Sequence, residues 1–188
     1  MKRKLFLTSC IVGVSLLAQG ASSESPAPAE PASGTTDRVG FPTDYRTRFK
    51  SLGVRVRPTA PEILTVYVND LAASVSSREQ LPFPEGAIIV MEFSYALKDS
   101  NNQLKRDANG EVLMGEVEHV DVMKRGKGFG EAYGANRSGE WEYAGYRLDG
   151  TYTTTPSASA HCAACHRGAG PENDFVFRMR APAKAAQM

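Results

Sequence analysis

Two cysteines and a histidine near the C-terminal end have the spacing that attaches a porphyrin covalently. The segment is Cys162-Ala163-Ala164-Cys165-His166, a C-x-x-C-H pattern. On one helical turn, two thiols separated by two residues can both add to the vinyl groups along one edge of a haem, and the next residue can offer its imidazole to the iron. The pattern predicts one haem c held through Cys162 and Cys165, with His166 as the proximal iron ligand.

Two other kinds of site also use a pair of cysteines with this spacing. One is a thioredoxin-like redox pair, and the other is half of a zinc site. The chain has three cysteines in all, so no second pair completes a zinc site. No βαβ pattern precedes the motif, as a thioredoxin-like site would require. Both alternatives therefore fit less well than haem.

The first twenty residues have the features of a secretory signal. A basic start at Lys2, Arg3 and Lys4 precedes an apolar segment over 5–18, which is too short to span a bilayer. Small residues at 18–20 suit cleavage; an uncleaved anchor is the alternative, but no stop-transfer pattern follows. Because bacteria attach haem to C-x-x-C-H outside the cytoplasm, we expect a signal peptide over 1–20 and a periplasmic protein.

The numbers of cysteines and charged residues limit which disulfides and which partners the mature chain can have. Cys10 would leave with the signal, so no thiol remains for a disulfide once haem occupies the other two. Loss of 1–20 removes three of the 22 basic side chains and none of the 21 acidic ones, which changes the formal charge from +1 to about −2. A nearly neutral chain without a basic stripe gives no reason to expect nucleic-acid binding.

Composition divides the rest of the chain into a linker, a domain and a tail. Residues 21–38 are rich in Ser, Pro, Ala, Gly and Thr, which predicts a disordered linker. Residues 39–180 predict one haem domain, and 181–188 a flexible tail. Within the domain, strands are expected at 63–68, 87–97, 111–123 and 141–148, helices at 43–52, 70–79 and 155–168, a turn at 82–86 and a polar hairpin loop at 99–110.

These elements predict the class of fold. Long strands joined by polar turns, with few helices, indicate an α+β fold that is mainly β, in which a few helices pack on an antiparallel sheet. Thr43 and Asn69 are the expected caps of the first two helices. Pro156 would stand in the first turn of the haem helix, with Gly168 near its end. Such a fold differs from the usual all-helical small cytochrome c.

Several short segments, in a particular order along the chain, add to the evidence of the haem motif. In chain order these are Val66–Asn69, Pro82–Gly86 leading into Ala87–Glu92, Met114–Glu116, Trp141 with Tyr143, the C-x-x-C-H motif, and Asp174–Phe177. In this combination the chain resembles the cytochrome P-460 family and its relative cytochrome c′-beta over nearly the whole domain. The resemblance implies a mostly antiparallel β fold, a five-coordinate haem with His166 proximal, and often a homodimer. The activities it implies are oxidation of hydroxylamine and binding or conversion of nitric oxide.

One position departs from the hydroxylamine-oxidising members of that family. In those members the strand after Phe-Pro-x-Gly carries a lysine bonded to the haem macrocycle, and Met91 stands at that position here. Lys98 is about 23 Å further along an extended strand than Met91, and its side chain would point to the opposite face. Lys105, Lys124 and Lys127 lie on other segments and stay open as crosslinking residues. The departure favours a haem that binds nitric oxide or related small nitrogen species; whether the protein is an enzyme stays open.

Met91 has three interpretations. It shares a strand face with Ile89 and Phe93, so it can be an ordinary core residue, line the distal side of the haem, or ligate the iron through its thioether. Ligation would make the protein a His/Met electron carrier. Phe93 and Tyr95 are expected to cap the distal side. The aromatic side chains expected to pack around the haem are Trp141, Tyr143, Phe175 and Phe177.

Asp121 is the carboxylate considered for catalysis. It falls close to where active members of the family hold a distal carboxylate, and it could act as a general base towards a bound N–OH species. The alternative is a solvated strand residue, because acidic residues are frequent in that segment. His119 is considered as a sixth iron ligand or a surface residue, whereas His161 directly precedes the motif and cannot readily reach the opposite face. Residues 124–128 predict a solvated basic loop, which could steer a periplasmic redox partner.

Overall fold

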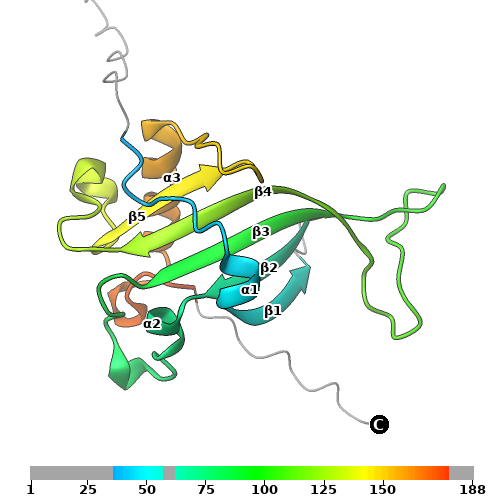
Figure 1. Ribbon diagram of the computed structural model, residues 1–188, viewed down its shortest axis with the longest axis horizontal. Coiled ribbons are helices and arrows are strands. Elements are labelled where there is room, and N and C mark those ends of the chain that lie inside the picture. Colours follow the sequence, from blue (N-terminus) through cyan, green and yellow to red (C-terminus); the bar gives the residue numbers. More distant parts are fainter. Residues whose placement is uncertain (1–35, 57–61, 178–188) are drawn as a thin grey trace, which may run out of the picture. The chain divides into compact units, whose positions relative to one another are not determined.

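Five antiparallel strands form one sheet in which each strand pairs with its neighbours in sequence, in the order β1-β2-β3-β4-β5 (Figure 1). The computed structural model describes residues 36–56 and 62–177. The predicted signal at 1–20, most of the predicted linker and the predicted tail at 181–188 lie outside these residues. The strands are β1 (Lys50–Val56), β2 (Glu62–Val68), β3 (Ile88–Ala96), β4 (Met114–Arg125) and β5 (Trp141–Tyr146).

The helices are short, except for the one that carries the haem motif. They are α1 (Tyr45–Arg48), α2 (Asp70–Ala73) and α3 (Pro156–Arg167), with 3-10 segments η1 (Arg78–Gln80), η2 (Glu131–Asn136), which is kinked at Gly134, and η3 (Pro171–Asn173). This is the predicted mainly β fold with an antiparallel sheet and a few helices. Among the described residues, no helix is long and apolar enough to span a membrane.

The first predicted helix is largely wrong. Helix α1 is a single turn, and Leu52, expected near its end, lies in β1. The expected cap Thr43 also does not begin the helix, since Asp44 holds the cap position, where its side chain accepts from Arg48 and caps no helix N–H. One helical turn fixes several residues for a single hydrogen bond, whereas 50–56 gains a ladder of backbone bonds along β2.

The cap predicted for the second helix is confirmed, although the helix is shorter than expected. The Asn69 side chain accepts the N–H of Ala72 at 2.9 Å and also that of Ile88 at 3.0 Å. Its amide nitrogen donates to the Gly86 carbonyl at 2.9 Å. One side chain therefore begins α2 and holds the turn before β3. The helix ends at Ala73, where a serine-rich segment follows.

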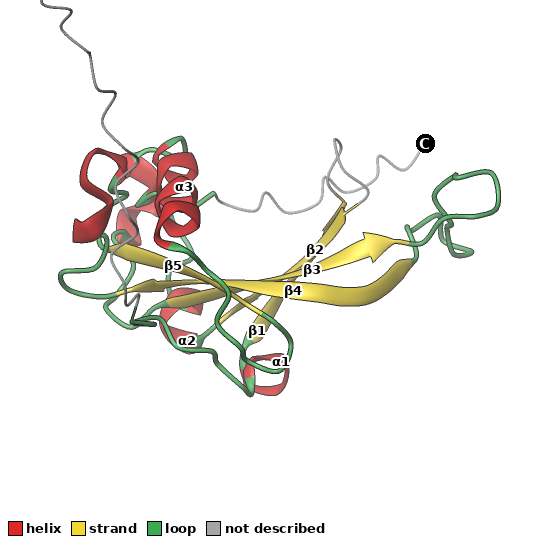
Figure 2. Cartoon of the chain, turned by 90° about the horizontal axis from the view of Figure 1, so that it is seen from above, coloured by secondary structure: helices red, strands yellow, loops and turns green. Residues whose placement is uncertain are grey.

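The sheet carries a separate apolar cluster on each face, because successive side chains of a strand point to opposite sides. We call them the first and the second cluster. The first contains Val66, Val68, Phe83, Ile89, Met123, Trp141, Tyr143, Ala163 and Val176. The second contains Val39, Tyr45, Val90, Val120, Val122, Ala144 and Tyr146. Helices α3 and α1 lie on opposite sides of the sheet, as Figure 2 shows.

Helix α3 has the predicted start and end. The Thr155 hydroxyl accepts the N–H of Ala158 at 3.2 Å, Pro156 occupies the first turn, and Gly168 follows the last residue. The Ser159 hydroxyl donates to the Tyr143 carbonyl of β5 at 2.8 Å. This contact holds the start of the helix to the outer edge of β5. The haem motif follows on the last turns of α3.

Candidate haem-binding site

The two cysteines of the motif lie close together on α3 in different surroundings. Cys162 is half-buried and packs against the first cluster, whereas Cys165 is exposed. Both are free thiols. Burial raises the pKa of Cys162 to about 11, with smaller contributions from the negative charges of Asp121 and Cys165. A redox-active C-x-x-C pair needs a thiol of lowered pKa, so the environment of Cys162 disfavours that alternative.

The imidazole of His166 is held in one tautomer. Its Nδ1 lies 2.8 Å from the Phe175 carbonyl oxygen, and because a carbonyl only accepts, Nδ1 must carry the proton. Nε2 therefore keeps its lone pair. Burial lowers the pKa of His166, which further favours the neutral ring. A neutral imidazole with one nitrogen tied to a backbone carbonyl is the form in which histidine binds metals.

Aromatic rings enclose His166 on two sides. The Tyr143 ring lies 4.8 Å and the Phe177 ring 5.2 Å from the imidazole, measured between centroids. Tyr143 is buried, whereas Phe177 is 52% exposed, so this part of the predicted pocket is open to solvent. Trp141 is fully buried in the first cluster.

The donor set fits a c-type haem better than a metal ion held by protein alone. Haem needs two thiols and one imidazole from the chain, and α3 presents all three within five residues. A structural zinc site needs four protein ligands. Within 36–56 and 62–177, no group of three or more His, Cys, Asp and Glu side chains is arranged to hold a metal ion.

Met91 and Phe175, two residues predicted to line the haem pocket, share one environment. Both are partly buried and pack against the first cluster, as Cys162 does. Met91 points to this face of the sheet from β3, opposite Asp121 of β4. The three interpretations of Met91 all agree with this position.

Asp121 is only partly exposed to solvent. It is half-buried between Met91 of β3 and Gly145 of β5, on the face of the sheet that carries the first cluster. Burial raises the pKa of Asp121, and the charge of His119 partly opposes the effect. Gly145 makes room for the carboxylate, because a Cβ there would lie 3.0 Å from its Oδ1.

Phe93 and Tyr95 do not form one cap. Phe93 is buried and stacks on His119, with 4.3 Å between centroids and 10° between the planes. The register of β3 and β4 shifts after Phe93, and Tyr95 is 52% exposed, with its hydroxyl donating to Glu118 at 2.8 Å. The extra residues of this irregular ladder lie on β4, whereas β3 pairs regularly with β2 through Tyr95, so Phe93 and Tyr95 share a strand face but differ in burial.

The four lysines considered for a crosslink lie in three places. Lys98 and Lys105 belong to the hairpin extension between β3 and β4, and Lys127 is exposed in the turn after β4. Lys124 donates from Nζ to the carbonyl of Val39, a residue of the second cluster, at 3.2 Å. Its amine is therefore directed to the face of the sheet opposite the first cluster.

The predicted basic loop at 124–128 is only partly correct. Lys124 and Arg125 are the last residues of β4, and Arg125 is half-buried between two carboxylates. His161 is exposed on α3, as its position before the motif implies. Sequence reasoning also missed the role of the Phe175 backbone, since a carbonyl that accepts a hydrogen bond leaves no trace in residue type.

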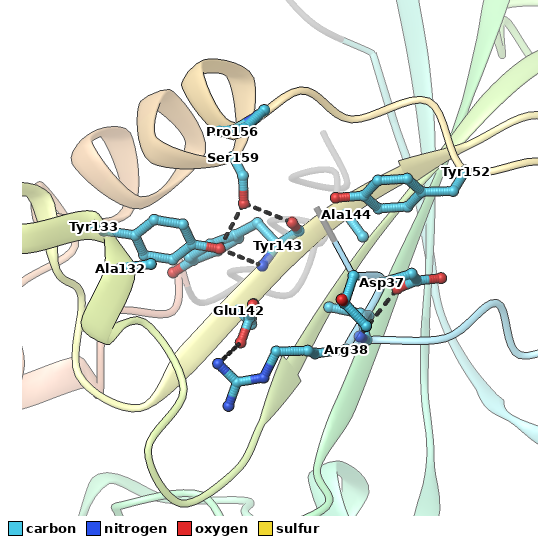
Figure 3. A pocket seen from close by; sticks show the side chains of 12 residues that line it. Asp37, Arg38, Ala132, Tyr133, Glu142, Tyr143, Ala144, Tyr152, Pro156 and Ser159 are labelled. Carbon is cyan, nitrogen blue, oxygen red and sulfur yellow. Dashed lines mark hydrogen bonds and ion pairs between the residues drawn. The ribbon is translucent and has the colours of Figure 1, made fainter. Parts of the chain in front are cut away.

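A small pocket of about 100 Å³ lies apart from the motif (Figure 3). Its lining includes Arg38, Tyr133, Glu142 and Ser159, but neither cysteine of the motif nor His166. Arg38 and Glu142 form an ion pair of 3.3 Å in it, and the hydroxyls of Tyr133 and Ser159 are hydrogen-bonded. This pocket is not the haem site.

Comparison with known families agrees with the geometry of α3. The family model for cytochrome P460 matches residues 42–178, which is most of the chain and includes every element of the sheet and the motif. No curated protein matches the sequence. The family implies a haem cofactor, and the free Nε2 of His166 beside two free thiols is the chemistry that haem requires. The chain therefore belongs to the cytochrome P460 family.

Proposed function

We propose that the protein is a periplasmic c-type cytochrome with one haem, five-coordinate through His166, which binds nitric oxide or related small nitrogen species as cytochrome c′-beta does. Cys162 and Cys165 would hold the haem covalently. The chemistry that the haem supplies is an open iron position for a small ligand. The chain's own residues hold the imidazole through the Phe175 carbonyl and flank it with the rings of Tyr143 and Phe177.

One observation carries this proposal in preference to hydroxylamine oxidation. At the position of the crosslinking lysine, Met91 presents an uncharged thioether to the first cluster, and the Lys124 amine is held on the other face by Val39. A thioether in place of a charged amine makes this side less polar, which suits a neutral diatomic ligand. Titration of the ferrous protein with nitric oxide should show saturable binding, while hydroxylamine turnover should be slow or absent. Turnover without nitric oxide binding would contradict the proposal.

Oxidation of hydroxylamine or nitric oxide is the second candidate, and Asp121 is the observation that favours it. A half-buried carboxylate with a raised pKa can exchange protons near neutral pH more readily than an exposed one. If the protein is such an oxidoreductase, Asp121→Asn should abolish turnover and leave nitric oxide binding unchanged. Equal activity of the variant and the wild type would exclude the role of base.

Iron ligation by Met91, which would make the protein an electron carrier with a periplasmic redox partner, is tested by one substitution. Met91→Leu keeps the volume and apolar character of the side chain and removes its sulfur. If the thioether ligates iron, the wild type should be low-spin and the variant high-spin. We expect both to be high-spin, because Met91 packs as a member of the first cluster.

We also propose a homodimer, as the family resemblance implies. Edge strand β1 supports it, since the apolar side chains Leu52, Val54 and Val56 are 43%, 56% and 40% exposed. Unpaired edges and exposed apolar side chains are features of sheet-mediated association. Sedimentation of the wild type should give twice the chain mass, and Val54→Lys should shift it towards the monomer. A monomeric wild type would contradict the proposal.

A further inference from the structure

We propose that Asp174 is a positioning residue for the proximal histidine. Together with Arg125, it holds the turn that presents the Phe175 carbonyl to His166, and it thereby sets how strongly the imidazole donates electrons to iron. The inference rests on the haem site proposed above. It adds a residue that does not touch the imidazole and that neither the motif nor its spacing indicates.

The backbone at Asp174 and Phe175 has an unusual conformation. Both residues are left-handed, with φ of 49° and 60°. Residues other than glycine rarely adopt this region of backbone conformation, and two such residues in succession are disfavoured more strongly. Such a turn persists only where surrounding contacts hold it. Its position is functional, because the carbonyl that leaves the turn is the one that accepts the Nδ1 proton of His166 at 2.8 Å.

Three separate segments hold Asp174. Its Oδ2 accepts the backbone N–H of Phe83 at 2.9 Å, and its backbone carbonyl accepts the indole N–H of Trp141 at 2.9 Å. Oδ2 also lies 3.4 Å from Nε of Arg125, as an ion pair without the alignment of a hydrogen bond. Asp174, Phe83 and Trp141 are all buried. The turn before β3, the end of β4 and the start of β5 therefore converge on one aspartate.

Arg125 balances the charge of the buried carboxylate. Its Nη2 donates to Oε2 of Glu140 at 3.1 Å, so the guanidinium lies between two carboxylates. A buried carboxylate without a partner would be strongly destabilised. Burial raises the pKa of Asp174, and the Phe83 N–H and the charge of Arg125 oppose that effect, so the two side chains act together.

Packing restricts Phe175 as well. A Cβ at Gly139 would lie 2.9 Å from Cδ2 of the Phe175 ring, so only glycine leaves room for the ring at that distance. Gly139 itself is left-handed, with φ of 63°. The ring is held on one side by Gly139 and packs against the first cluster on the other. With both ends of the turn fixed, the distance from the Phe175 carbonyl to His166 has little freedom.

The hydrogen bond to Nδ1 has a predictable electronic effect. A histidine that donates its second N–H to a carbonyl is a more basic ligand, and hydrogen bonds of this kind are one of the means by which a protein adjusts haem iron. A weaker bond would make the imidazole a weaker donor. The ferric state would then be less favoured, and the iron–histidine bond would weaken.

The test uses the haem-loaded protein and two spectroscopic readings that do not depend on activity. Asp174→Ala removes the carboxylate and disfavours the left-handed turn. We expect a higher midpoint potential. The ferric–ferrous equilibrium should shift by up to about tenfold, which corresponds to about 59 mV for one electron. The ferrous iron–histidine stretch in resonance Raman spectra should move to lower frequency. Asp174→Asn, which tolerates the turn and keeps an oxygen for Phe83, should recover most of both values.

The matched control is Asp149→Ala. Asp149 is exposed, and its carboxylate accepts the Thr151 N–H in a surface turn, so the same chemical change there should leave both readings at wild-type values. Wild-type potential and stretch in Asp174→Ala would overturn the proposal. If that variant does not accumulate folded, Arg125→Gln decides: the iron–histidine stretch should move to lower frequency, and an unchanged stretch overturns the proposal. A wild type that binds no haem would instead refute the proposed function.

Discussion

The residue that matters most, His166, depends on a partner that carries no functional side chain. The C-x-x-C-H spacing predicted its role as an iron ligand, but not which of its nitrogens is available. The Phe175 carbonyl decides this by accepting the Nδ1 proton at 2.8 Å. That contact is set by backbone conformation at two residues, so residue types alone could not predict it.

Replacement of His166 separates attachment of haem from ligation of iron. In His166→Ala, the two thioether bonds should keep the haem on the chain, because they involve only Cys162 and Cys165. The ferrous iron–histidine stretch should disappear. Resonance Raman spectroscopy of the purified variant measures this, and haem staining of a denaturing gel verifies attachment. An unchanged stretch would mean that His119 or His161 is the ligand.

Asp121 should make stability depend on pH in a defined direction. Burial raises its pKa above the unfolded value of 3.8, so the folded state binds the proton more tightly. The stability this contributes is fully present below pH 3.8 and is lost as pH rises through the folded pKa. The side chain of Asp121→Asn cannot ionise. As pH rises from the unfolded to the folded pKa of Asp121, the free energy of unfolding of the variant minus that of the wild type should therefore increase. The expected slope there is about 1.4 kcal/mol per pH unit.

Urea unfolding of both proteins from pH 3.5 to about 7 measures that difference, over a range set by the raised pKa of Asp121. Asp149→Asn is the control with the opposite sign. The N–H of Thr151 lowers the pKa of Asp149, so its contribution is present at higher pH and lost on acidification. A difference between Asp121→Asn and the wild type that does not change with pH would contradict the buried position of Asp121.

Among the elements, those with a strong internal signal were predicted well. Strands β2 and β3 follow from β-branched segments, β5 from its aromatic residues, and helix α3 from Thr155, Pro156 and Gly168. Strand β1 was missed because Gly53 interrupts it and nearly all of its side chains are exposed, so it has no pattern of buried and exposed residues; its backbone hydrogen bonds to β2 hold it in the sheet. The role of Arg125 was missed because Glu140 and Asp174, which are distant in sequence, reach it only in the folded chain.

Helix α3 should be sensitive to its N-terminal cap. Thr155→Ala removes the acceptor for the Ala158 N–H and should cost about 1 kcal/mol of stability. The haem motif lies on the last turns of the helix, so ligation at His166 should be unaffected. Thr153→Ala, at an exposed position just before α3, is the matched control. Equal denaturation midpoints for the two variants would show that the cap does not contribute.

At the scale of the whole molecule, the sheet brings together residues that sequence order separates. The first cluster joins β2, β3, β4, β5, α3 and the segment after it, so that Met91, Cys162 and Phe175 all pack against one cluster although they lie far apart in the sequence. The place of Met91 beside this cluster is the feature on which the proposed binding of nitric oxide, in preference to hydroxylamine oxidation, depends.

The absorption spectrum of the purified, reduced protein tests the central claim most directly. A five-coordinate haem c with Met91 in place of the crosslinking lysine should give an ordinary high-spin Soret band, which shifts when nitric oxide is added. A far-red-shifted Soret band would reveal a bond between the haem macrocycle and a lysine and would favour hydroxylamine oxidation. A low-spin spectrum would reveal a sixth protein ligand, and either result would contradict the account.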